Sequence, residues 1–134
     1  MAFQSREKKP FSSCVQGIGE SYLRRPVCHD VYGDPTLQPE MEWIITKCAE
    51  RDTIQTRPFC ESLGLAEDQA RAVIHAAPRS KEQQLRQAVF AWSKSDEATL
   101  EKLLEALYIS DEVELVESIC ESEFCLVYIL VIFI

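Results

Sequence analysis

Cysteine and histidine are the residue types in this chain best suited to chemistry, as nucleophile and base or as metal ligands. The 134 residues include six cysteines and two histidines, at Cys14, Cys28, Cys48, Cys60, Cys120, Cys125, His29 and His75. A cysteine nucleophile needs a base within hydrogen-bond distance and a third group that orients the base. No local motif supplies these three groups together, so we expect no cysteine enzyme.

Zinc and phosphate sites are also poorly supported. Structural zinc sites use ligand pairs such as Cys-x2-Cys, whereas Cys28 and His29 are adjacent and Cys14 stands alone. The chain has no Gly-x4-Gly-Lys motif for phosphate. We therefore expect no metal, no cofactor and no catalytic activity, and keep a small cysteine- or zinc-dependent enzyme as a rival class.

Packing explains the cysteines better than chemistry does. Cys48, Cys60 and Cys120 each fall on the apolar side of a helical pattern, and an unpaired cysteine behaves as a small buried hydrophobe. No apolar leader follows "MAFQSREKKP". These features indicate a reducing, cytoplasmic setting with reduced thiols, of which Cys14 and Cys28 should be the more accessible.

The hydrophobic pattern divides the chain into three segments. Residues 1–38 are rich in turn residues without a sustained period, which predicts a flexible N-terminal arm. Residues 39–123 show six successive helical patterns and no strand alternation, so we expect an all-α fold, a six-helix antiparallel bundle. Residues 124–134 form an apolar C-terminal tail.

Each expected helix carries one apolar stripe and start or stop signals. Pro39 should begin the first helix, Gly64 should end the second, and "SKEQ" at Ser80 is a capping box. Ser95 should begin the fifth helix, and Asp111 should cap the sixth. The expected inward residues are Met41, Ile44, Ile45, Cys48, Phe59, Cys60, Leu63, Ala70, Val73, Ile74, Leu85, Ala88, Val89, Trp92, Leu100, Leu103, Leu104, Leu107, Val113, Val116, Ile119 and Cys120.

The formal net charge of −8 is unevenly distributed, because residues 95–123 hold ten acids and one base, Lys102. So acidic a surface argues against nucleic-acid binding and favours a basic protein partner. We predict an acidic contact face at Asp96, Glu97, Glu101, Glu105, Asp111 and Glu112. We predict a complementary basic face at Arg57, Arg71, Arg79, Lys81 and Arg86. Contact between unlike faces of two copies would be heterologous.

The motifs of the second half carry a family resemblance. "FCESLGL" closes the second helix, a Trp closes the fourth, and "ATLEKLLEAL" and "LVESIC" follow in order. In these features residues 41–123 resemble the death domain family, with the nearest likeness to the death domains of neurotrophin receptors in the tumour necrosis factor receptor superfamily. Many death domains have a Trp at the start of the second helix, where this chain has Thr56 or Arg57.

The resemblance implies a signalling adaptor or regulator in apoptotic or inflammatory signal transduction. Such a protein would associate homotypically with other death-domain proteins or with itself, and catalysis would belong to recruited enzymes. The alternative is an intracellular fragment of a membrane-associated death receptor, held at the membrane by its apolar tail.

The tail "FCLVYILVIFI" is open to four interpretations. A membrane helix needs about 20 apolar residues, so this is about half a span. The tail could pack on the bundle, anchor weakly at a membrane surface, or belong to a truncated span. It could also be an artefact of gene prediction, such as intron read-through.

Overall fold

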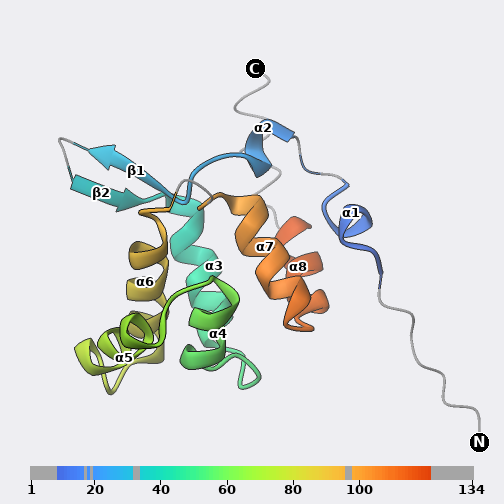
Figure 1. The fold of residues 1–134 in the computed structure, drawn as a ribbon. Helices are drawn as coiled ribbons and strands as arrows, with labels where there is room; N and C mark the ends of the chain where they lie inside the picture. Colours follow the sequence, from blue (N-terminus) through green and yellow to red (C-terminus); the bar gives the residue numbers. More distant parts are fainter. Residues whose placement is uncertain (1–8, 17, 19, 32–33, 96–97, 122–134) are drawn as a thin grey trace, which may run out of the picture.

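The chain is mostly helical, with one small β-hairpin (Figure 1). The structure, a computed structural model, describes residues 9–16, 18, 20–31, 34–95 and 98–121. The elements in chain order are α1 (Phe11–Cys14), α2 (Glu20–Leu23), β1 (Cys28–Val31), β2 (Asp34–Leu37), α3 (Pro39–Ala49), α4 (Thr56–Ser62), α5 (Glu67–Ala76), α6 (Lys81–Trp92), α7 (Leu100–Ile109) and α8 (Val113–Cys120). The prediction of a helical chain is confirmed, and the hairpin is an element that it did not include.

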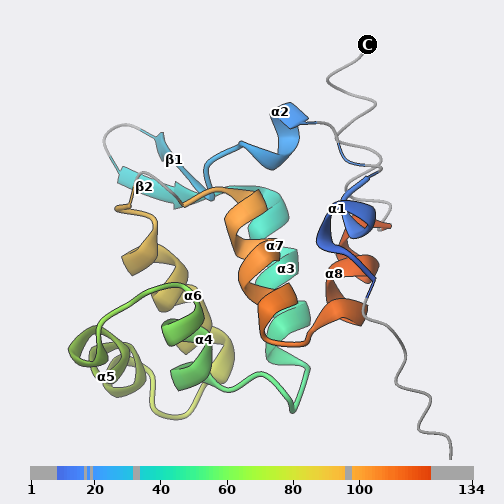
Figure 2. The same ribbon diagram turned by 45° about the vertical axis from the view of Figure 1, so that its right-hand side comes forward.

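The six helices α3 to α8 pack around a common core. α6 lies against α3, α4 and α5, and α8 lies against α7 and α3. α5 and α8 lie on opposite sides of the bundle in both views (Figures 1 and 2). The β-hairpin pairs Cys28 with Leu37 in antiparallel register and projects beyond the helices.

Local signals set most helix ends. Pro39 is the first residue of α3, Ser80 caps α6 by accepting a hydrogen bond from the Gln83 amide, and Gly64 follows α4 with a φ of 83°. A residue without a Cβ adopts such a φ at little cost, which suits Gly64 to end a helix.

Two predicted helix starts are wrong. α7 begins at Leu100 and is capped by Thr99, whose hydroxyl accepts from the Lys102 amide, rather than by Ser95. α8 begins at Val113, and the residue in the N-cap position is Glu112, whose side chain makes no capping bond, rather than Asp111. The Glu112 carboxylate is engaged elsewhere, as described below.

The apolar stripes form one core. Leu85, Ala88 and Val89 of α6 are fully buried, and Trp92 at its end is 7% exposed. The last helix differs from the prediction: Leu115 is buried, while Val113 and Cys120 are half-buried at the edge of the core. Every other predicted inward residue is buried except Ile74, which is half-buried.

The N-terminal region does not match the predicted flexible arm where the structure describes it. Its apolar residues Cys14, Val15, Ile18, Leu23, Val27 and Leu37 are buried in the core. The backbone is tied to the start of α7: the Val27 amide donates to the Ala98 carbonyl, and the Leu100 amide donates to the Arg25 carbonyl, both at 3.0 Å. The prediction failed because isolated apolar residues and backbone bonds between distant residues leave no periodic pattern.

Replacing Trp92 by Ala should lower the free energy of unfolding by about 3–5 kcal/mol, because it removes a large ring from the core and leaves a cavity. The measurement is urea unfolding followed by circular dichroism. Trp43→Ala is the matched control. Because Trp43 is only half-buried, this variant should lose less unfolding free energy than Trp92→Ala. Equal losses in the two variants would contradict the placing of Trp92 in the core.

Candidate interaction surface

The acidic side chains of α7 and α8 are the densest group of like charges in the described part of the chain. Glu101 is half-buried in the first turn of α7, where the helix dipole favours a carboxylate. Glu105 is 40% exposed and lies 3.8 Å from the Lys102 ammonium. Asp111 is exposed in the turn after α7, with a φ of 64°. Asp96 and Glu97 lie outside the described residues.

Glu112 was predicted for this surface, and the structure corrects that prediction. Its side chain is 6% exposed and accepts a hydrogen bond from Arg51 Nε at 2.8 Å. The Thr53 hydroxyl donates a second, short hydrogen bond to the same carboxylate. Glu112 therefore ties the turn before α8 to the loop after α3. It stabilises the fold and is not available to a partner.

Lys81 was predicted for the basic face, and it too has a structural role. Its ammonium donates to the carbonyl oxygens of Arg51 and Ile54, at 2.9 and 3.0 Å. These carbonyls lie in the loop that Glu112 also holds. The half-buried Lys81 ammonium thus satisfies two backbone acceptors of this loop, so most of its hydrogen-bonding capacity is used within the fold.

The other predicted basic residues divide into two groups. Arg86 is 22% exposed and paired with Glu42 at 2.5 Å, so most of its charge is used within the bundle. Arg57 and Arg71 are at least half exposed and both approach Glu67, at 3.7 and 3.1 Å. Arg79 is exposed in the turn after α5. The basic face that remains consists of Arg57, Arg71 and Arg79.

The structure adds three acids to those singled out from the sequence. Glu114 and Glu117 of α8 and Glu121, the residue that caps its C-terminal end, lie three and four residues apart, so they follow one another along one side of the helix. We call these three residues the acidic stripe. Their helical spacing was visible in the sequence, but only the boundaries of α8 establish that Glu114 and Glu117 lie within it and that Glu121 directly follows it.

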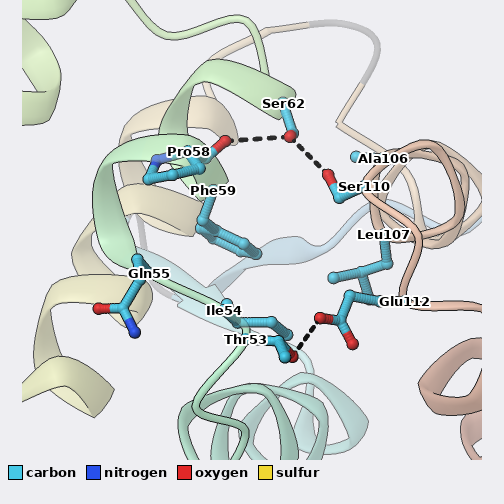
Figure 3. Close-up of a pocket in the computed structure, with 10 residues that line it drawn as sticks. All are labelled: Thr53, Ile54, Gln55, Pro58, Phe59, Ser62, Ala106, Leu107, Ser110 and Glu112. Carbon is cyan, nitrogen blue, oxygen red and sulfur yellow. Dashed lines mark hydrogen bonds between the residues drawn. The ribbon is translucent and has the colours of Figure 1, made fainter.

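A small hollow opens between α4 and the turn after α7 (Figure 3). Ile54, Phe59 and Leu107 form its apolar wall, and the hydroxyls of Ser62 and Ser110 meet at its rim, 2.8 Å apart. Its volume is about 40 Å³, far below the roughly 300–1,000 Å³ of typical small-molecule sites. The hollow has room for water, not for a metabolite.

Comparisons with known proteins add no assignment: no family model, curated protein or solved structure matches the chain. In the described part of the chain, no three His, Cys, Asp or Glu side chains are grouped so that they could hold a metal ion. None of the described helices has the length and apolarity needed to cross a membrane.

The thiols differ in accessibility from the prediction. Cys14 is buried rather than accessible, as are Cys48 and Cys60, while Cys28 and Cys120 are half-buried. No disulfide joins the cysteines of the described residues. Burial raises the pKa of Cys48 to about 12, and the nearby Glu112 carboxylate adds to this rise.

Replacing Glu112 by Ala should lower the free energy of unfolding by about 1–3 kcal/mol, because Arg51 and the Thr53 hydroxyl lose their acceptor. Thermal and urea unfolding measure the loss. Glu105→Ala is the matched control on the exposed surface and should change stability by less than about 0.5 kcal/mol. Equal stability of Glu112→Ala and the parent would show that the contacts of Glu112 with Arg51 and Thr53 do not stabilise the fold.

Cys48 should make the protein lose stability at alkaline pH. Its folded pKa of about 12 lies above the ordinary thiol pKa of 9.0, so the folded state keeps the proton to higher pH. This contribution is fully present below pH 9 and decreases as pH rises towards 12, by about 1.4 kcal/mol per pH unit. Urea unfolding at several alkaline pH values should therefore give a steeper decline for the parent than for Cys48→Ala. Parallel curves would contradict the shift.

Proposed function

We propose that this protein is a non-catalytic signalling adaptor whose helical bundle associates with other bundles of the death-domain type, including further copies of itself. The main support is the position of the residues that carry the resemblance to death domains: they lie in the core or at helix ends. Trp92 closes α6 in the core, and Thr99 caps α7. Leu103 and Leu104 of α7 are fully buried. The motif residues thus hold together a bundle of six consecutive helices.

The charges of the surface support association between unlike faces. Acids dominate α7 and α8, whereas the exposed arginines Arg57, Arg71 and Arg79 lie on α4, α5 and the turn after α5. Because α5 and α8 lie on opposite sides of the bundle (Figures 1 and 2), the acidic side of one copy can meet the basic side of the next. Such a heterologous contact builds rings or open chains.

The setting proposed for this adaptor is the cytoplasm, in apoptotic or inflammatory signal transduction. The buried thiols are suited to a reducing compartment, because each is packed as a small apolar side chain and no disulfide joins the described residues. The enzymes that carry out the response would be recruited proteins, and this chain would supply the scaffold.

A charge exchange tests the proposed association. One variant, Glu105→Lys with Glu121→Lys, makes the acidic side basic, and a second, Arg71→Glu with Arg79→Glu, makes the basic side acidic. Each variant alone should self-associate more weakly than the parent, because like charges then face each other. An equimolar mixture should associate again, since each altered side meets an opposite charge. Sedimentation velocity of the whole chain at low and high salt measures these states.

The control for this experiment is Glu50→Lys with Asp52→Lys, which reverses two exposed acids outside α7 and α8. It should associate like the parent. High salt should weaken association of the parent, since exposed charges are screened over about 8 Å at physiological ionic strength. A mixture that stays as dissociated as its two components would refute the charge-guided contact.

A further inference from the structure

Residues 9–16 of the N-terminal region, which we call the strap, lie along α8. The Tyr108 hydroxyl donates to the Lys9 carbonyl oxygen at 2.7 Å, and the rings of Phe11 and Tyr108 pack edge to face with centroids 5.6 Å apart. α1, within the strap, lies beside α8 in both views (Figures 1 and 2). These contacts fix the position of Lys9 and Phe11 on the bundle.

The strap also brings a positive charge to the acidic stripe. The Lys9 ammonium lies 3.9 Å from a carboxylate oxygen of Glu117, the middle residue of the stripe, and the two side chains are 48% and 33% exposed. Glu114, one turn before Glu117 in α8, and Glu121, at the C-terminal cap of the helix, are both exposed. Among the described residues, Lys9 is the base that an ion pair joins to this stripe.

We propose that the strap is an autoinhibitory contact, in which Lys9 occupies the acidic stripe and a basic partner surface must displace it. This inference rests on the proposed function, because the stripe belongs to the side that would meet Arg71 and Arg79 of another copy. A tethered segment competes at an effective concentration of the order of millimolar. An exposed ion pair, weak by itself, is then enough to lower the apparent affinity for a partner.

The test uses a labelled octalysine peptide as a probe of the acidic surface, with binding followed by fluorescence anisotropy at low salt. Lys9→Glu removes the ion pair, and Tyr108→Phe removes one hydrogen bond of the strap without changing any charge. Both variants of the whole chain should bind octalysine about two- to fivefold more tightly than the parent. Adding Glu114→Gln and Glu121→Gln to Tyr108→Phe should abolish the gain.

Lys47→Glu is the matched control, because Lys47 is 41% exposed and pairs with Glu50 at 3.6 Å. Lys47→Glu changes the net charge by the same amount as Lys9→Glu. Its smaller gain in octalysine affinity therefore measures the effect of net charge alone. Equal gains in Lys9→Glu and Lys47→Glu, with none in Tyr108→Phe, would overturn the inference.

Self-association of the same proteins separates the two proposals. Where the parent associates, Lys9→Glu and Tyr108→Phe should associate more tightly, and unchanged or weaker association would overturn the autoinhibitory contact. If the parent and all variants remain monomeric while the two strap variants gain octalysine affinity, the proposed homotypic association fails. The strap then still shields the stripe from basic surfaces.

Discussion

The short length of the helices is the constraint on which the rest of the structure depends. α3 to α8 are 7 to 12 residues long, and helices of this length are marginal in water by themselves. Each must therefore bury an apolar stripe against its neighbours. α6 is central to this packing, because its residues Leu85, Ala88 and Val89 are completely buried and it contacts α3, α4 and α5.

Because the apolar stripes face inward, the outer faces of the helices carry polar side chains. Polar residues of the same type nevertheless have different roles, as two glutamates show. Glu105 is exposed beside Lys102, whereas Glu112 is buried between Arg51 and Thr53. The difference follows from position: Glu105 lies on the outside of a helix, while Glu112 stands in a turn that faces another loop. A run of acidic residues in the sequence therefore identifies a contact surface only when it is known which of them lie in turns that face the rest of the protein.

Patterns with a fixed period could be predicted from the sequence, and contacts between distant residues could not. The leucines of α7 and the stripe of α6 repeat every three or four residues, so their burial follows from helix geometry. The roles of Lys81 and Arg86 were missed because their partners lie 27 to 44 residues away. The hairpin and the strap were missed because short segments held by backbone bonds and single apolar residues show no period.

The pairing of Val27 with Ala98 has a consequence for the order of synthesis. The bond joins the segment between α2 and β1 to the segment just before α7, so the acceptor for the Val27 amide is made only after α3 to α6 have been translated. At roughly 5–20 residues per second, that delay lasts on the order of several seconds. During this interval α1 and α2 lack their final neighbours, α8 and α7. The arrival of α7 and α8 therefore completes the packing of α1 and α2 as well as the bundle, so these four helices fold together in a single late event.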